Sequence, residues 1–334
     1  TGRNQITMAE VPIETAASYA AADADFTERL YALLGSELHQ KEISNLYNNV
    51  EIPLIAILVQ MQRNGVSLNS TFLKEMSISL GAKLDSIQTE IFESIGHEFN
   101  LNSPKQLSDI LFTELRLPPT KKTTLGFSTN AQSLDELKNK LYRGEAADSD
   151  PRSYDVLNNI LEYREVSKLK STYVDALPEL VNVITNRLHT SYRQTGTTTG
   201  RLSSNDPNLQ NIPVRTDLGR RVREAFISGK GSSLLAADYS QIELRVLAHF
   251  SRDPALMKAF ENGEDIHSAT SSLVYDIPID KVDSNMRRIA KVLNFGVIYG
   301  LSPHGIARQT NLSQNDGKKF IDIYFNKYPG IQEY

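Results

Sequence analysis

The chain of 334 residues contains no cysteine and no tryptophan. Without cysteine it can form no disulfide bond and no thiolate metal site. No apolar run approaches the roughly 20 residues of a membrane-spanning helix, so we expect no association with a membrane. The N-terminus also lacks a basic stretch followed by an apolar one, which argues against a secretory signal. These absences favour an intracellular protein.

The chain also lacks a strong net charge, since its formal charge is −4 at pH 7. The charges are unevenly distributed along it. Residues 1–50 carry three Lys or Arg against seven Asp or Glu, whereas residues 285–320 carry six Lys or Arg against one acid. A local basic surface of this kind attracts polyanions even when the average charge is negative. The length is enough for two or three domains, each with its own core.

Hydrophobic periodicity predicts a mainly helical chain. Residues 15–34 are rich in alanine and predict a helix that stops at Gly35. Residues 51–64 predict an apolar helix that ends at Gly65, and residues 70–96 predict a long helix with one apolar stripe.

Residues 185–240 are rich in Gly, Thr, Ser and Asn and predict the edge of a β-sheet with its loops. Within them "SSLLAAD", residues 232–238, has the continuous apolar character of a strand buried on both faces, and it ends on Asp238. A carboxylate at the end of a rigid strand suits a hard cation such as Mg²⁺. The alternative is that Asp238 is a turn residue or a helix cap. Ser240 and Glu243 have the spacing of a capping box.

The segment "MRRIAKVLNFGVIYG", residues 286–300, predicts an amphipathic helix with a chemically distinctive face. At about 100° per residue, four residues share that face: Arg287, Lys291, Phe295 and Tyr299. Four apolar residues cluster on the opposite face, which we expect to be buried: Met286, Ile289, Leu293 and Val297. Cations suit the phosphates of a nucleotide, and rings suit stacking on a base. Gly296 would leave a bare surface beside Phe295. The alternative is an ordinary surface stripe whose rings are partly in the core.

The segment "TTTGRLSSNDPNLQNIP", residues 197–213, combines one arginine with three amides. Arg201 is followed by Asn208, Gln210 and Asn211. Arginine and amide side chains can reach base edges and sugars in a nucleic-acid groove. The alternative is a polar, turn-rich loop.

Four motifs, in this order, resemble those of the family A DNA polymerases of the bacterial polymerase I type: "TGRLSSNDPNLQNIPVR", "DYSQIELRVLAH", "DIHSAT" and "RRIAKVLNFGVIYG". The resemblance extends across nearly the whole chain, because "NVEIPLIAILVQMQRNGVSL", "FNLNSPKQL" and "SKLKSTYVDALP" are also similar to the family. It implies an α+β, predominantly helical chain with the right-hand fold of palm, thumb and fingers.

The resemblance implies five parts of the chain. They are the C-terminal end of a 3′–5′ exonuclease-like domain (1–35), the lead-in to the polymerase domain and its palm (36–70), the thumb (71–170), the first part of the palm with the metal-binding aspartate (171–250), and the fingers (251–334).

The resemblance also implies a role for each motif residue. Asp238 would bind two Mg²⁺ ions, with the Tyr239 backbone carbonyl as a further ligand, and Glu243 would close off the 2′ side of the sugar. The catalytic residues would be Asp238, Arg287 and Lys291. The incoming dNTP would contact Gln241, Glu243, His267, Arg287, Lys291, Phe295 and Tyr299. The primer–template DNA would contact Lys168, Lys170, Arg201, Asn208, Gln210, Asn211 and Tyr299, together with the loop around Lys121.

The sequence departs from the family pattern at both ends. It holds no His-Asp-Glu sequence, the family motif that carries the second metal-binding carboxylate. Tyr19 and Asp23 in "YAAADADFTERL" resemble the last exonuclease motif, but without its earlier carboxylates we expect them to be structural. We therefore expect an internal fragment with an incomplete palm sheet.

The sequence thus predicts a DNA-directed DNA polymerase, a nucleotidyltransferase that adds deoxynucleotides to a primer 3′-hydroxyl by a two-metal mechanism. The alternative is a catalytically inactive fragment that binds DNA and dNTP. A helical nucleic-acid binder unrelated to polymerases would require four motifs to coincide. We expect a monomer that acts in DNA replication or repair, in the cytoplasm with the bacterial nucleoid or in a eukaryotic organelle.

Overall fold

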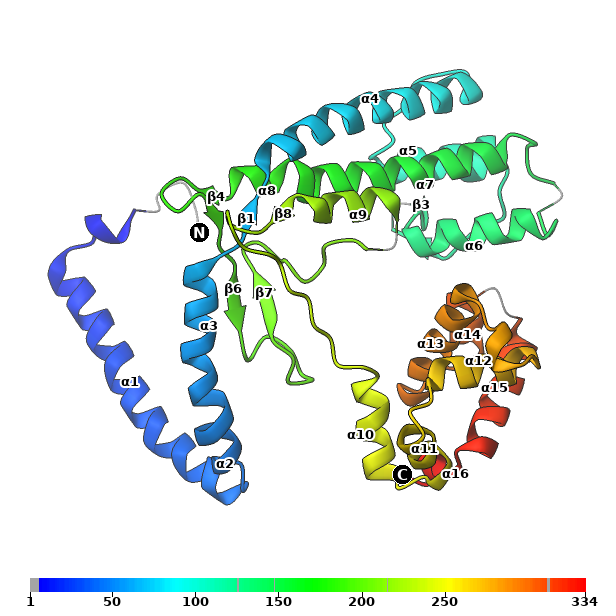
Figure 1. The fold of residues 1–334 in the computed structure, drawn as a ribbon. Coiled ribbons are helices and arrows are strands. Elements are labelled where there is room, and N and C mark those ends of the chain that lie inside the picture. Colours follow the sequence, from blue (N-terminus) through cyan, green and yellow to red (C-terminus); the bar gives the residue numbers. More distant parts are fainter. Residues whose placement is uncertain (1–5, 125, 147, 215, 311–312) are drawn as a thin grey trace. The chain divides into compact units, whose positions relative to one another are not determined.

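The structure is a computed structural model that describes residues 6–124, 126–146, 148–214, 216–310 and 313–334. The chain divides into two compact units, a first unit of residues Thr1–Leu234 and a second unit of residues Leu235–Tyr334. Helices dominate both units (Figure 1). In the ranges given above, no helix is both long and apolar enough to cross a membrane.

Among its described residues the first unit holds helices α1 to α9 and four short 3₁₀ or π helices. The helices are α1 (Ile13–Gln40), α2 (Ser44–Leu46), α3 (Ile52–Asn64), α4 (Ser70–Ile95), α5 (Pro104–Asp109), α6 (Ala131–Tyr142), α7 (Ser153–Leu169), α8 (Ala176–Glu179) and α9 (Asp217–Glu224). The 3₁₀ and π helices are η1 (Met8–Glu10), η2 (Tyr47–Glu51), η3 (Ile110–Glu114) and η4 (Lys170–Val174).

The strands of the described residues are short and pair two by two in antiparallel ladders. They are β1 (Ser67–Leu68) with β8 (Phe226–Ile227), β2 (Lys122–Thr123) with β3 (Gly126–Phe127), β4 (Val181–Asn182) with β5 (Arg187–Leu188), and β6 (Ser191–Arg193) with β7 (Ser203–Asn205). The mainly helical α+β character expected from the sequence is confirmed.

Helix α1 does not stop at Gly35, as the sequence predicted, but continues to Gln40. A glycine inside a helix costs only about 1 kcal/mol, and the residues that follow Gly35 are compatible with a helix. No described side chain crowds this position. The expected stop was therefore wrong because a single glycine weakens a helix without ending it.

The turn from α3 to β1 depends on Gly65, as predicted. Gly65 has φ of +56°, and a Cβ on it would lie 2.6 Å from the Leu188 carbonyl oxygen. The Arg187 guanidinium donates to the carbonyl oxygens of Asn64 and Gly65, at 2.6 and 3.1 Å. These bonds satisfy carbonyls that the end of α3 leaves without helical partners. Helix α4 then ends at Gly96, as the pattern of residues 70–96 predicted.

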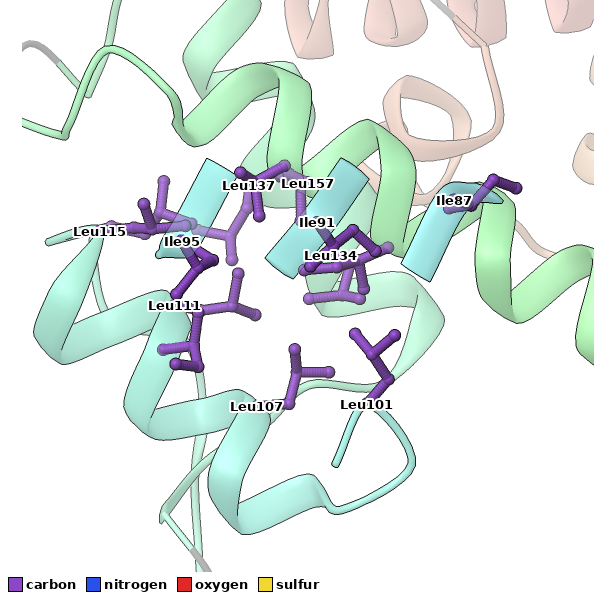
Figure 2. Packing of buried hydrophobic residues seen from close by; sticks show 14 residues of the cluster. Ile87, Ile91, Ile95, Leu101, Leu107, Leu111, Leu115, Leu134, Leu137 and Leu157 are labelled. Atoms are coloured by element: carbon purple, nitrogen blue, oxygen red, sulfur yellow. The ribbon is translucent and has the colours of Figure 1, made fainter. Parts of the chain in front are cut away.

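A hydrophobic core fills the space between α4, α5, η3, α6 and α7 (Figure 2). Helix α4 contributes Ile87, Ile91 and Ile95, whose spacing of four places them on one stripe. Leu134 and Leu157 face them from α6 and α7 and are fully buried. Each such side chain contributes roughly 1.5–3 kcal/mol by leaving water. The single apolar stripe expected on this helix is therefore its packing face.

A second core of the first unit joins the start of α4 to the end of α7 and to α9. It contains Leu73 and Met76 from α4, Leu169 from α7, and Val222 from α9. Helix α9 lies within residues 185–240, where we expected only strands and loops. Its cap is Thr216, whose side chain accepts a hydrogen bond from the Gly219 amide.

The expected buried strand at residues 232–238 is wrong. This segment has neither helix nor strand, and all of its residues are exposed, with Leu235 at 94%. A strand forms only when neighbouring strands accept its backbone hydrogen bonds. Among the described residues no strand pairs with this segment.

The second unit is helical in all its described regular structure except one 3₁₀ turn, η5 (Ile279–Lys281). Its helices are α10 (Ile242–Ser251), α11 (Pro254–Glu261), α12 (Ile266–Tyr275), α13 (Ser284–Ile298), α14 (Pro303–Gln309), α15 (Gln314–Lys327) and α16 (Pro329–Glu333). A single core joins them and includes Leu244 of α10, Leu293 of α13 and Tyr324 of α15. Because α10 packs into this core, it belongs with the residues that follow it. The five-part domain division remains a prediction.

Candidate functional site

Helix α13 has most of the apolar face that its sequence predicted, but Met286, expected to be buried, is half-buried and is not part of the core of the second unit. Leu293 and Val297 are buried in the core of the second unit, and Ile289 packs against it. Lys291 is exposed on the other face. The side chain of Asp283 caps the helix. Its Oδ1 accepts hydrogen bonds from the backbone amides of Asn285 and Met286, both at 2.8 Å. The cations and rings of α13 therefore stand on a rigid support.

The end of α13 differs from expectation at Gly296. The Leu301 amide donates to the Gly296 carbonyl and the Gly300 amide donates to the Val297 carbonyl, the pattern of a Schellman motif. Gly300, at φ of +71°, makes this turn possible. The turn folds Leu301 over Gly296, where an added Cβ would lie 2.9 Å from Leu301 Cδ2. The surface at Gly296 is thus covered and not bare.

Arg287 makes an ion pair with Asp265, the cap of α12. Its Nε and Nη2 both donate to Asp265 Oδ2, at 2.9 and 2.6 Å. Asp265 Oδ1 also accepts from the Ser268 amide. Partial burial alone would raise the pKa of Asp265, but the hydrogen bonds from Arg287 and Ser268 outweigh it and lower that pKa. The pair fixes the guanidinium beside the N-terminus of α12.

His267 lies in the first turn of α12 and is almost fully buried, at 2% exposure. Its ring centroid is 5.6 Å from that of Phe295. Burial lowers the pKa of His267 to about 4; the Asp265 carboxylate opposes this shift, and the cations Arg287 and Lys291 add to it. The imidazole is therefore neutral at pH 7. Sequence motifs brought together by the fold thus place a neutral histidine next to two cations and a ring.

Tyr299 and Glu243 form the other end of this face. The Tyr299 hydroxyl donates to Glu243 Oε2 at 3.1 Å. The capping box expected for Ser240 and Glu243 is wrong, because α10 begins one residue later and its cap position is Gln241. Gln241 adopts φ of +54°, and its Oε1 accepts from the Ile266 amide at 3.2 Å. The Glu243 side chain therefore does not cap α10, and it accepts the hydrogen bond from Tyr299.

Asp238 and Tyr239 lie in the exposed segment that precedes α10. A carboxylate and a backbone carbonyl are ligands of the kind that Mg²⁺ takes, alongside waters and substrate phosphates. These two residues therefore fit such an ion in kind. The described residues gather no group of three or more His, Cys, Asp or Glu side chains that could hold a metal ion. The described residues thus supply only some of the ligands that a Mg²⁺ ion would need.

Three of the predicted DNA contacts of the first unit, Lys168, Gln210 and Asn211, lie at one groove. Arg201 is exposed, and its backbone carbonyl accepts from the Thr197 hydroxyl. Gln210 donates from Nε2 to the Leu202 carbonyl, and its amide donates to Asn208 Oδ1. Gln210, Asn211 and Lys168 line a groove of about 880 Å³ with the end of α7 and η4. The fold thus brings four of the predicted residues together: Lys168, Asn208, Gln210 and Asn211.

The three lysines predicted to contact DNA differ in their surroundings. Lys168 is exposed at the groove, but Lys170 donates to Asp175 Oδ2 at 2.8 Å, and Asp175 also accepts from Ser77. Lys170 is therefore occupied by an ion pair at the base of α4. Lys121 is exposed, next to the β2–β3 hairpin.

Tyr19 and Asp23 lie one turn apart on the exposed surface of α1. The Asp23 carbonyl accepts from the Thr27 hydroxyl within the same helix. Their expected structural role stays a prediction.

Sequence reasoning missed three residues of this site: Asp265, Thr270 and Asn294. Asp265 had a local signal. In "DIHS" an aspartate stands three residues before Ser268, which is the spacing at which a capping aspartate accepts from a backbone amide. Asn294 and Thr270 had none, because their contacts join two helices that are far apart in the sequence.

The sequence profile described as DNA polymerase family A matches residues 70–334. The chain belongs to this family. Over its full length it is 45% identical to DNA polymerase I of Chloroflexus aurantiacus and 43% identical to that of Pseudomonas aeruginosa, covering 35% of each. It is also 45% identical, over 92% of its length, to the thermostable DNA polymerase I of Thermus aquaticus, of which it covers 36%. The chain thus spans about a third of the length of these curated relatives.

The structure is similar to the POL domain of Pol1 from M. smegmatis, which was solved in complex with DNA primer-template and dNTP. The TM-score is 0.79 at 38% identity, and the match covers 90% of this chain and 51% of that one. The predicted polymerase fold, predominantly helical, is therefore confirmed.

Proposed function

We propose that this chain supplies the nucleotide-binding face and one metal-binding carboxylate of a DNA-directed DNA polymerase. The observation that carries the proposal is the face of α13. Arg287 and Lys291 present two cations, Phe295 lies beside a buried neutral histidine, and Tyr299 is held by a carboxylate. Phosphoryl transfer depends on positioning and on neutralising charge more than on covalent catalysis, and this face suits both tasks.

Each residue would act on a different part of the incoming dNTP or on the template opposite it. Arg287 and Lys291 would bind the triphosphate and neutralise the charge that develops on the leaving pyrophosphate. Phe295 would pack against the sugar and base. Tyr299 would lie at the templating position, and Glu243 would crowd the 2′ position of the sugar and so favour deoxynucleotides.

Asp238 and the carbonyl of Tyr239 would hold Mg²⁺. When bound, the metal would favour ionisation of the primer 3′-hydroxyl and stabilise the leaving pyrophosphate. Asp238 would contribute a negative charge and one or two oxygen ligands from a segment exposed to solvent.

Primer–template DNA would bind along the groove that Lys168, Gln210 and Asn211 line. Lys168 would contact backbone phosphates, and the amides would contact sugars and base edges. Such contacts predict affinity for DNA that falls with added salt.

We propose a monomer that works in the cytoplasm on chromosomal DNA.

Lys291→Ala, with Lys318→Ala as a matched control, tests this function. Both lysines are exposed in the second unit, but Lys318 lies on a different helix, α15. In the whole polymerase bound to primer–template, Lys291→Ala should lower kcat/KM for dNTP by roughly 10²-fold, and Lys318→Ala should leave it unchanged. Equal kinetics in the two variants would remove Lys291 from the nucleotide site.

A further inference from the structure

Three buried polar side chains, His267, Thr270 and Asn294, join α12 to α13 next to Phe295. His267 and Thr270 of α12 are each 2% exposed, and Asn294 of α13 is fully buried. Asn294 Nδ2 lies 2.9 Å from His267 Nδ1, and the Thr270 hydroxyl donates to Asn294 Oδ1 at 3.0 Å. Buried polar groups are costly unless they are hydrogen-bonded, and in this arrangement the three side chains satisfy one another.

The trio determines which nitrogen of His267 carries the proton. Since Thr270 donates to the amide oxygen, the amide nitrogen of Asn294 is turned toward His267 Nδ1. An amide nitrogen can only donate, so Nδ1 must accept with its lone pair. In a neutral imidazole the single proton is then on Nε2.

Burial, more than the neighbouring charges, lowers the pKa of His267 and keeps the ring neutral. Asp265 favours its protonated form, whereas burial and the cations Arg287 and Lys291 disfavour it more strongly. The identity of the protonated nitrogen therefore decides whether the ring offers a donor or an acceptor to a ligand.

We propose that Asn294, oriented by Thr270, is a positioning residue that holds His267 as the Nε2–H tautomer, so that it donates to a phosphate oxygen of the triphosphate. The choice of ligand rests on the proposed function. Arg287 and Lys291 attract an anion, and a neutral N–H beside them adds direction without adding charge. An Nδ1–H tautomer would present a lone pair from Nε2 and repel that oxygen.

Two substitutions separate this role from simple packing. Asn294→Asp keeps the shape but replaces the donor by an acceptor, so the ring must place a proton on Nδ1. Thr270→Val keeps the shape of its side chain but removes the hydroxyl that orients the amide, so both tautomers should be populated. Asn285→Asp is the matched control, because Asn285 is exposed in the first turn of the same helix.

The test is ¹⁵N NMR of the histidine-labelled chain, in which the protonated and unprotonated ring nitrogens are directly distinguished. We expect Nε2–H at His267 in the wild type and in Asn285→Asp, a proton on Nδ1 in Asn294→Asp, and a mixture in Thr270→Val. Nδ1–H in the wild type, or an unchanged Nε2–H tautomer in both Asn294→Asp and Thr270→Val, would overturn the proposal. This readout needs no nucleotide, so its result is independent of the proposed function.

A double-mutant cycle in the whole polymerase then tests the link to the triphosphate. Asn294→Asp should weaken dNTP binding by roughly 10- to 100-fold, the loss expected for one hydrogen bond to a charged group. The same change made on top of His267→Ala should cost much less. Equal losses with and without His267 would show that Asn294 acts by another route and would overturn the positioning role. A wild type that does not bind dNTP would instead contradict the proposed function.

Discussion

The hydroxyl of Tyr299 donates a hydrogen bond of 3.1 Å to Oε2 of Glu243, joining the end of α13 to the first turn of α10. The two residues are 56 positions apart in the sequence. The bond places a ring and a carboxylate at the same end of the proposed nucleotide-binding face. Under the proposed function Glu243 contacts the sugar of the incoming nucleotide and Tyr299 lies at the templating position, so this bond links the two.

We expect Glu243→Ala to raise the incorporation of ribonucleotides relative to deoxynucleotides. The carboxylate would no longer crowd the 2′ position, and a change of roughly tenfold or more is expected for the loss of such a steric block. Single-nucleotide incorporation with matched ribo- and deoxynucleotides measures the ratio. Tyr299→Phe removes the hydrogen bond but keeps the carboxylate, so it should raise the ratio less. An unchanged ratio in Glu243→Ala would remove Glu243 from the sugar site.

Arg287→Ala should lower kcat/KM for dNTP by roughly 10²- to 10³-fold, the effect of removing one preorganised charge donor. It should also raise the pKa of Asp265, because two hydrogen bonds that stabilise the charged carboxylate would be lost. Arg288→Ala is the matched control, since Arg288 is exposed on the same helix and bonds to Asn285. Nucleotide kinetics that fall equally in both variants would indicate a general effect of charge.

The stability of the second unit should fall in acid because of His267. Its pKa is lowered by burial from 6.5 to about 4 in the folded chain. The unfolded chain therefore takes up the proton first, so this contribution to stability is complete above pH 6.5 and is lost as the pH falls to 4. The loss is on the order of 3 kcal/mol. Urea denaturation between pH 4 and 7 measures it.

His267→Gln should remove this part of the pH dependence, since glutamine does not titrate in this range. A variant whose stability depends on pH as steeply as the wild type would mean that other groups cause the loss.

Two glycines of the first unit should respond oppositely to alanine. In Gly65→Ala the new Cβ would lie 2.6 Å from a carbonyl oxygen at φ of +56°, so we expect a loss of roughly 2–4 kcal/mol. In Gly35→Ala no described atom lies within 4 Å, and the residue is inside α1, so we expect a gain of about 0.5–1 kcal/mol. Urea midpoints compare the two. If Gly35→Ala also lowered the stability, it would contradict a helix α1 that continues through Gly35.

The helices of the site could be predicted from sequence because their signals are local. The face of α13 follows from a repeat of four residues over four turns, and its buried side follows from the same repeat. The local pattern wrongly predicted a strand at residues 232–238, because strand formation depends on pairing with strands elsewhere in the chain. Likewise, the contact of His267 with Asn294 has no signal in sequence spacing, because it arises only when two helices pack.

The most direct test of the whole account is Mg²⁺-dependent primer extension by the whole polymerase with Asp238→Ala. Asp280→Ala is the matched control, because Asp280 is an exposed aspartate of the same unit, in η5. We predict that Asp238→Ala lowers the extension rate by roughly 10³-fold or more while primer–template binding persists, and that Asp280→Ala extends at the wild-type rate. Extension by Asp238→Ala at the wild-type rate would contradict the central claim that this carboxylate serves a polymerase active site.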